Sequence, residues 1–256
     1  MANQTIKATG IVIKEIKTKE NDRIITVLSA ELGVINIYAK GAMRLKNKFH
    51  SATGLFTYSE FILFEQRSSD LYLINEASVK HIFHRLSTNV EYLALAMYMS
   101  ELVCEVTVPD DMNKEILRLF LNMLHMLTNK KWSVSLCKAA FEMRLMRNIG
   151  LQPNMLGCKK CMEFEKSIFY FDTENGEIVC TDCWQPYDKG YFIAEMPCVM
   201  ALRYLVYAEL EKMFTFNITG IPLLQLSRIC ERYVQEHTKF DYKTLDFFKS
   251  VHIEEK

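Results

Sequence analysis

Four of the eight cysteines in this chain of 256 residues form two Cys-x-x-Cys pairs, Cys158 with Cys161 and Cys180 with Cys183. The pairs are separated by 18 residues, which gives the pattern C-x2-C-x18-C-x2-C. Each pair can form a tight knuckle that directs two sulfurs to one point, and four thiolates complete a tetrahedral zinc site. The spacing therefore predicts one Zn²⁺ held by these four cysteines.

A site closed by four cysteines has no open coordination position, so we expect a structural zinc that does not activate water. Residues 167–170 and 177–179 can pair as a hairpin around the turn at 172–176. Two alternatives for the cysteines are unligated thiols and a dithiol oxidoreductase. The second is less favoured because both pairs lie in an insert bordered by Gly and Pro rather than at a strand-to-helix junction.

The first 80 residues have the pattern of an antiparallel β domain. Five segments rich in Ile, Val, Phe and Tyr are separated by turn-like sequence, which includes residues 66–70; they lie near 10–16, 23–28, 34–40, 58–65 and 71–79. Five short strands in a segment of this length are most economically closed as a small barrel. We predict a barrel of the oligonucleotide/oligosaccharide-binding (OB) type, with an SH3-like barrel as the alternative.

From residue 81 the apolar period changes from two to about 3.6, which indicates helices. Helical spacing runs through 89–106, 114–129 and 133–149, with a break at 109–111, and returns at 197–214, 221–237 and 243–252. The predicted fold class is therefore α+β. An OB barrel (1–80) precedes a helical domain in two parts (81–150 and 191–256) that flank the zinc module (151–190), and we expect the two parts to pack together.

The overall charge does not indicate a partner, because 31 Lys and Arg balance 31 Asp and Glu. Locally, residues 39–59 contain no acid, whereas Lys40, Arg44, Lys46 and Lys48 fall within nine positions. A long connection after a strand is a candidate binding loop. Basic side chains near aromatic rings suit single-stranded nucleic acid, since phosphates take the charge and bases stack on rings.

We therefore predict that Lys40, Arg44, Lys46 and Lys48 bind nucleic acid, and we assign Arg23, at the start of the second predicted strand, to the same set. The nearby rings are Tyr38, Phe49, Phe56 and Tyr58. Among them, Phe56 is better explained as a core residue than as a stacking platform.

Other classes of protein fit the sequence poorly. The N-terminal residues do not build the apolar core of a secretory signal, and the longest apolar stretch, Tyr92–Met99, is far below the roughly 18 to 20 residues of a membrane span. We expect a soluble cytoplasmic protein without membrane partners. No phosphate-loop motif occurs, so we do not expect nucleotide hydrolysis by that route.

Several segments, taken in order, resemble the family of the DNA repair and recombination mediator RecO, and together they extend over nearly the whole chain. They are Gly10–Ile13, Asn21–Ser29, Glu31–Gly33, Ala39–Arg44, Asn148–Pro153 with the four cysteines that follow, and Phe240–Phe248. Lys40, Gly41 and Arg44 lie on the barrel motif of the family, whereas Lys46 and Lys48 are added on charge alone. Met162 stands where zinc-bearing members often have glycine.

The resemblance implies a nucleoid-associated protein that binds single- and double-stranded DNA and anneals complementary strands coated with the single-stranded-DNA-binding protein SSB. It also implies contact with the acidic C-terminal tail of SSB and, together with RecR, loading of the recombinase. On the same resemblance we do not expect an enzyme. The tail site would be an apolar pocket edged by basic residues on the helical domain, for which Lys138, Arg144 and Arg147 are candidates; the alternative is that they are charged residues on the outer face of a core helix. The alternative from another class is a zinc-stabilised protein-interaction adaptor that does not bind nucleic acid.

Overall fold

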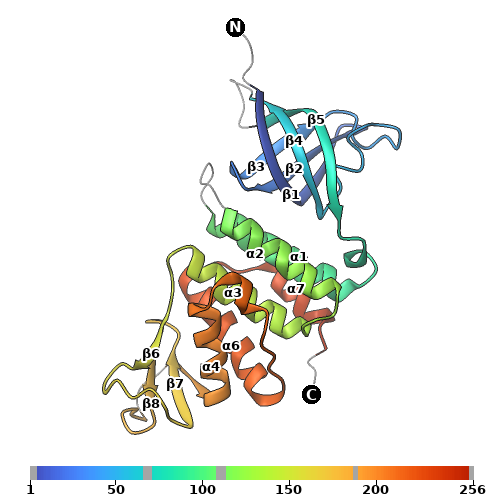
Figure 1. The fold of residues 1–256 in the computed structure, drawn as a ribbon. Helices are drawn as coiled ribbons and strands as arrows, with labels where there is room; N and C mark the ends of the chain where they lie inside the picture. Colours follow the sequence, from blue (N-terminus) through green and yellow to red (C-terminus); the bar gives the residue numbers. More distant parts are fainter. Residues whose placement is uncertain (1–4, 66–70, 108–113, 187–189, 254–256) are drawn as a thin grey trace. The chain divides into compact units, whose positions relative to one another are not determined.

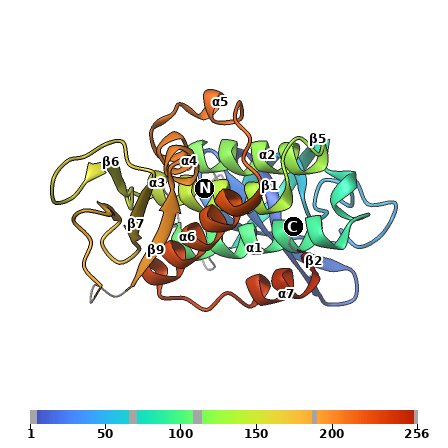
Figure 2. The same cartoon turned by 90° about the horizontal axis from the view of Figure 1, so that it is seen from below.

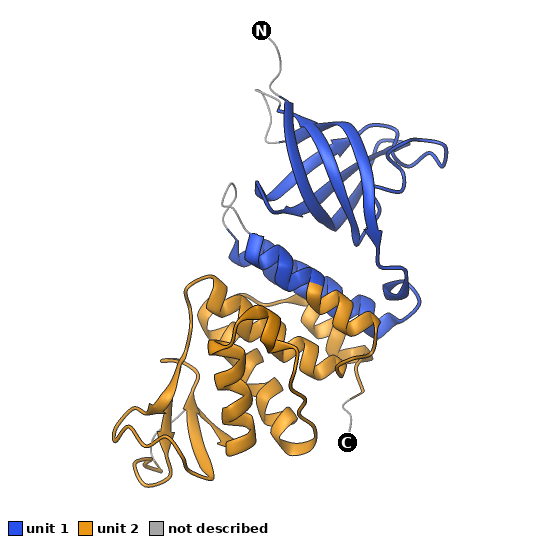
Figure 3. Ribbon diagram, viewed as in Figure 1, with its two compact units in different colours: residues 1–121 blue, residues 122–256 orange. Residues whose placement is uncertain are grey.

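The structure is a computed structural model that describes residues 5–65, 71–107, 114–186 and 190–253 (Figure 1). It divides into two compact units, residues 1–121 and 122–256, with the boundary inside α2 (Lys114–Thr128) (Figure 3). The predicted turn at 66–70 and the predicted helix break at 109–111 lie outside the described residues. The finer division at residues 80, 150 and 190 stays a prediction.

A closed five-stranded barrel forms most of unit 1. Its strands are β1 (Thr5–Thr18), β2 (Asp22–Ser29), β3 (Gly33–Ala39), β4 (Thr57–Phe64) and β5 (Leu71–Ile82). The order around the barrel is β1-β2-β3-β5-β4, and β4 pairs back to β1. All pairs are antiparallel except β3 with β5. All five strands predicted from the sequence are confirmed.

Alternate residues of the strands fill the barrel, as the two-residue period of a strand requires. The buried core consists of Ala8, Val12, Ile25, Val27, Ile35, Ile37, Phe61 and Leu63. Gly10 lets β1 approach β2 closely, because a Cβ there would lie 2.4 Å from the carbonyl oxygen of Leu28. The close approach explains why this strand position carries no side chain.

The helices begin where the apolar period changes. A short 3-10 helix, η1 (His84–Leu86), precedes α1 (Val90–Val106). The side chain of Asn89 caps α1 by accepting hydrogen bonds from the backbone N–H groups of Glu91 and Tyr92. Among the helices of the described residues, none is both long enough and apolar enough to cross a membrane.

Unit 2 is built around α3 (Val134–Asn148), in which every residue from Val134 to Met146 is buried. Around it lie α4 (Met196–Tyr207), α5 (Leu210–Met213), α6 (Gly220–Thr238) and α7 (Lys243–Val251). The helix α3 packs against both α4 and α6, so one helix from before the cysteine-rich insert lies in the same unit as helices from after it. The predicted grouping of all the helices into one domain stays a prediction, because α1 belongs to unit 1.

The single helix predicted over 197–214 is wrong. The backbone of Ala208 and Glu209 is extended, which separates α4 from α5. Arg144 of α3 donates to the carbonyl oxygens of Leu205 and Ala208 at this break, and α4 ends there. Helical spacing of apolar residues cannot reveal such an interruption, because both short helices keep the same apolar face.

The cysteine-rich insert forms a four-stranded sheet in the order β6-β8-β7-β9. Its strands are β6 (Asn154–Cys158), β7 (Ile168–Asp172), β8 (Glu177–Cys180) and β9 (Tyr191–Glu195). The predicted hairpin is confirmed as β7 and β8, which pair antiparallel. The strands β6 and β9 were not predicted, and Figure 2 shows β9 beside α6.

Candidate nucleic-acid interface and candidate metal centre

Residues 40–56, which connect β3 to β4 and are called the basic loop below, fold as a succession of hydrogen-bonded turns. Backbone bonds join Arg44 N to Gly41 O (3.0 Å), Asn47 N to Arg44 O (2.9 Å) and His50 N to Asn47 O (3.0 Å). The apolar residues Ala42, Phe49, Ala52 and Phe56 anchor the loop, since all four are buried. The basic loop is therefore an ordered platform.

The four predicted cations of this loop are all exposed, and no acid lies among them in the sequence. Lys48 Nζ donates to the backbone carbonyl oxygen of Asn75 (3.3 Å) and lies 4.8 Å from the centre of the Phe49 ring. The structure brings Lys40, Arg44, Lys46 and Lys48 together on one ordered loop. Such a surface suits the phosphates of a polyanion.

Arg23 differs from these four residues, because it is only 6% exposed. Its Nη1 donates to the carbonyl oxygen of Thr53 (2.8 Å) and forms an ion pair with Glu15 (3.3 Å), while Nε lies 3.3 Å from Met43 Sδ. The burial does not support the predicted direct contact between Arg23 and nucleic acid. Arg23 lies beneath the basic loop and holds it.

The aromatic residues near the loop fall into two groups. Phe49 and Phe56 are buried, and the interpretation of Phe56 as a core residue is confirmed. Tyr38 and Tyr58 are half-buried. The hydroxyl of Tyr38 donates to the carboxylate of Asp22, so this ring has a structural task within the barrel.

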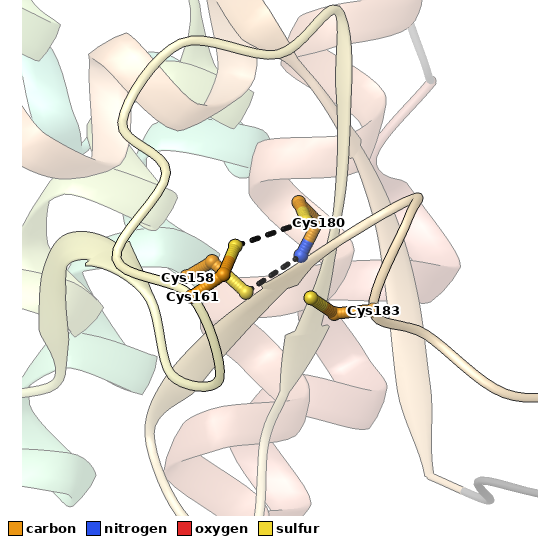
Figure 4. Close-up of side chains that lie close together, drawn as sticks. All are labelled: Cys158, Cys161, Cys180 and Cys183. Atoms are coloured by element: carbon orange, nitrogen blue, oxygen red, sulfur yellow. Dashed lines mark hydrogen bonds between the residues drawn. The ribbon is translucent and has the colours of Figure 1, made fainter.

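The four paired cysteines converge on one point in unit 2 (Figure 4). Their Sγ atoms all lie within 4.8 Å of one another, and Cys161 Sγ is 3.7 Å from Cys180 Sγ. Four sulfurs at about 2.3 Å from a tetrahedral zinc ion stand about 3.8 Å apart. The arrangement fits a single metal ion of this kind.

Two neighbouring strands bring the pairs together, because Cys158 ends β6 and Cys180 ends β8. Burial alone would raise the pKa of the Cys158 thiol, but backbone N–H groups, that of Cys180 first, stabilise the thiolate and lower its pKa to about 6. The sulfurs of Cys161 and Cys180 raise the pKa of Cys183 to about 12. Four thiolates this close repel one another, and a divalent cation among them removes that cost.

The first knuckle forms although Met162 carries a β-carbon. Met162 N donates to Cys158 O (2.8 Å), and Met162 adopts the left-handed conformation with φ at 63°. Cys158 N in turn donates to Glu163 O (2.9 Å). The conformation that glycine favours is therefore present here, at the steric cost of a side chain in the left-handed region.

The predicted basic edge of a tail-binding pocket is wrong for Lys138 and Arg144. Both are buried: Lys138 forms ion pairs with Glu142 (2.8 Å) and Glu231 (2.9 Å), and Arg144 donates to two backbone carbonyls. Their positive charges are used inside unit 2. Their spacing in the sequence could not show this, because it does not reveal that α3 is buried from Val134 to Met146.

Unit 2 contains an apolar hollow of about 520 Å³ whose lining residues were not predicted from the sequence. It lies between the cysteine-rich sheet and α4, and its apolar lining includes Met155, Leu156, Phe164, Met200 and Tyr207. Arg203 joins two segments of the lining, because it donates to the carbonyl oxygens of Met155 (2.8 Å) and Phe164 (2.9 Å). Lys212, paired with Glu209, stands on its rim.

Comparison with protein families matches residues 1–83 to the family described as "Recombination protein O N terminal" and residues 87–246 to "Recombination protein O C terminal". The chain belongs to the RecO family. Among its curated relatives, "DNA repair protein RecO" of Acetivibrio thermocellus is 34% identical, with 96% of this chain and 97% of the relative covered. The protein of the same name from Alkaliphilus metalliredigens is 28% identical, with 96% and 99% covered.

Membership in the RecO family confirms the resemblance found in the sequence. It supports a role in DNA repair and recombination for this chain. The structure adds two features to that role: an exposed basic loop on the barrel and a cluster of four cysteines that fits a metal ion.

Proposed function

We propose that this RecO-family chain is a recombination mediator whose barrel binds single- and double-stranded DNA through the basic loop. The observation that carries the proposal is the ordered loop itself, on which Lys40, Arg44, Lys46 and Lys48 are exposed with no acid among them. Phosphates are the natural partners of such a surface, because binding them releases condensed counterions. The location on an OB-type barrel agrees with this use.

The mechanism rests on charge and requires no bond chemistry. The loop cations hold a strand by its phosphates, and a second strand brought close meets less electrostatic repulsion, so complementary strands pair faster. Annealing of strands coated with SSB follows if the protein also contacts SSB. With RecR, the same protein helps to load the recombinase.

The four cysteines would hold one structural zinc ion, which would fasten the knuckles of β6 and β8 and so fix the sheet of the insert. All four sulfurs converge on one point, so no position is left open for a water nucleophile. The metal would therefore act through folding and take no direct part in DNA binding.

For the acidic tail of SSB we propose the apolar hollow of unit 2 as the binding site. Its lining offers exposed apolar surface at Leu156, Phe164 and Met200, and Lys212 on the rim offers a cation. Such a site fits an acidic peptide, because a carboxylate can pair with the cation while apolar side chains of the peptide enter the hollow. Met200→Asp should weaken binding of a labelled tail peptide, whereas Ile193→Asp, an equally exposed position on β9 outside the lining, should not.

The loop is tested by replacing Lys40, Arg44, Lys46 and Lys48 together with alanine. Affinity for single-stranded DNA should fall, and the slope of log K against log salt should become shallower by about 0.7 for each phosphate that the loop no longer neutralises. Lys7→Ala with Lys80→Ala, which removes exposed cations that pair with Glu60 elsewhere on the barrel, is the control. Unchanged affinity in the loop variant would remove the loop from the DNA site.

Annealing of complementary strands coated with SSB, measured with full-length SSB and with SSB lacking its tail, tests the mediator role. We expect acceleration that depends on the tail. If the zinc-loaded protein accelerates neither reaction and binds no DNA, the chain is better described as a zinc-stabilised interaction adaptor.

A further inference from the structure

We infer that Asp22 and Arg23, at the start of β2, are positioning residues that hold the basic loop in its DNA-binding conformation. The inference rests on the proposed function of the loop and adds which residues keep the loop ordered. Neither residue offers its charge to a ligand, because Asp22 is 9% exposed and Arg23 is buried as well. Asp22 accepts a hydrogen bond from the backbone of the loop, and Arg23 donates one to it.

Three consecutive residues hold the beginning of the loop and its end. The carbonyl oxygen of Asn21 accepts from Met43 N (3.0 Å), and Asp22 Oδ1 accepts from Gly41 N (2.8 Å). Arg23 Nη1 donates to Thr53 O (2.8 Å). Arg44, Lys46 and Lys48 lie between these attachments, and Lys40 directly precedes the first of them, so the segment 21–23 fixes both ends of the platform.

Asp22 is suited to this task as a carboxylate. Its second oxygen accepts from the hydroxyl of Tyr38, and this bond, followed by the one from Gly41 N, holds the pKa of Asp22 below its ordinary value. Gly41 has φ at +69°, a left-handed conformation that frees its N–H from the β3 ladder and directs it to Asp22. The carboxylate therefore fixes the point where the loop leaves β3.

Arg23 holds the other end of the basic loop, at Thr53. Glu15 of β1 neutralises its charge, and Thr53 contributes its carbonyl oxygen (2.8 Å) and its hydroxyl (3.3 Å) as acceptors. A buried guanidinium with these partners is costly to remove, since its acceptors are then left unsatisfied. A loop held in this way loses little conformational entropy when it binds, and such preorganisation raises affinity.

The direction in which removal of the Asp22 carboxylate changes DNA affinity distinguishes a positioning role from a long-range electrostatic effect. Removing a negative charge beside a DNA site should strengthen binding if only long-range charge matters. We expect Asp22→Ala to weaken binding of single-stranded DNA about tenfold, the effect of losing one hydrogen bond to a charged group. Glu20→Ala, which removes an exposed acid of the same turn, should leave the affinity unchanged or slightly raise it.

Arg23 is tested by the salt dependence of binding. If Arg23 neutralised a phosphate directly, its removal would make the slope of log K against log salt shallower by about 0.7. We expect Arg23→Ala to lower the affinity at every salt concentration with an unchanged slope, because the loop cations still reach the phosphates once the loop is ordered. Lys46→Ala is the matched comparison, because it removes an exposed loop cation and should make the slope of log K against log salt shallower.

Asp22→Asn keeps an oxygen for Gly41 N and should restore most of the affinity lost in Asp22→Ala, which a general need for negative charge would not predict. If Asp22→Ala does not fold, Tyr38→Phe is the alternative variant, because it removes one hydrogen bond to the Asp22 carboxylate. Hydrogen exchange at the amides of residues 41–53 then reports whether the loop opens. Faster exchange with weaker binding supports the inference.

Two results would overturn the inference. One is tighter or unchanged binding in Asp22→Ala, and the other is faster loop exchange without loss of affinity. If the fourfold loop variant loses binding in the same experiments, the DNA-binding function of the loop stands and only the positioning role is lost. If the fourfold variant also binds normally, the proposed function itself is wrong.

Discussion

At the residue scale, the cysteine knuckle depends on positions that carry no metal ligand. A Cβ on Gly157 would lie 2.8 Å from the carbonyl oxygen of Met162, and the other two nearest atoms also belong to the backbone. The turn of the knuckle therefore occupies the space in which a side chain would stand. Backbone atoms cannot move aside as a flexible side chain can, so the turn itself would have to shift.

Gly157→Ala should weaken zinc retention by about 10- to 100-fold, the usual effect of disturbing residues that hold metal ligands in place. Metal content after dialysis against graded chelator concentrations measures this. Gly54→Ala is the control, because its new Cβ would meet neighbours at ordinary distances of 3.4 and 3.6 Å. Full zinc retention in Gly157→Ala would show that the knuckle is held by the cysteines alone.

At the element scale, α3 is a core helix that carries charge inside unit 2. Glu142 is fully buried and pairs with Lys138, which also pairs with Glu231 of α6; Lys249 of α7 joins the other side of Glu231. The attraction of the two carboxylates raises the pKa of Lys138 although burial works against it, so the amine stays charged. These ion pairs link α3, α6 and α7.

Lys138→Met should destabilise the protein by about 3–5 kcal/mol, because it breaks the buried ion pairs of Lys138 with Glu142 and Glu231. Adding Glu142→Leu should recover part of the loss, since the buried carboxylate that lost this ion pair is then removed as well. Urea denaturation of the single and double variants measures both effects. Lys212→Met, which breaks an exposed pair with Glu209, should change the stability little, and a similar loss there would contradict the role of burial.

At the scale of the whole molecule, the two candidate sites belong to different units. The basic loop lies in unit 1, and the four cysteines lie in unit 2. The strands of the sheet β6-β8-β7-β9 have only four or five residues each, and a bound metal is a usual way to stabilise so small a module. Metal removal should therefore act on the insert first.

Purified protein should carry one zinc ion per chain, measured by mass spectrometry of the metal, and Cys180→Ser should lose it. Chelation should abolish hydrogen-exchange protection of the strands β6, β7, β8 and β9 while the amides of the barrel strands keep theirs. Cys104→Ser is the control, because it replaces a cysteine outside the cluster and should leave the zinc content unchanged. Anaerobically prepared protein without zinc, or loss of barrel protection first, would contradict this assignment.

Much of this architecture was predictable, because its signals are local. Five strands follow from alternating apolar residues, most helices from the 3.6-residue period, and the metal centre from the spacing of Cys158, Cys161, Cys180 and Cys183. The strands β6 and β9 escaped prediction, because each is defined by its pairing with β8 or β7 rather than by an apolar pattern of its own.

The sequence by itself determined which residues can perform chemistry: four thiols at metal spacing and a segment of cations without acids. Tertiary structure alone decided which charges face solvent. Arg23, Lys138 and Arg144 have the same kinds of side chain as the loop cations, but long-range packing buries them against partners 30, 93 and 61 residues away, such as Thr53, Glu231 and Leu205. Burial depends on contacts between distant segments, and no local pattern encodes them.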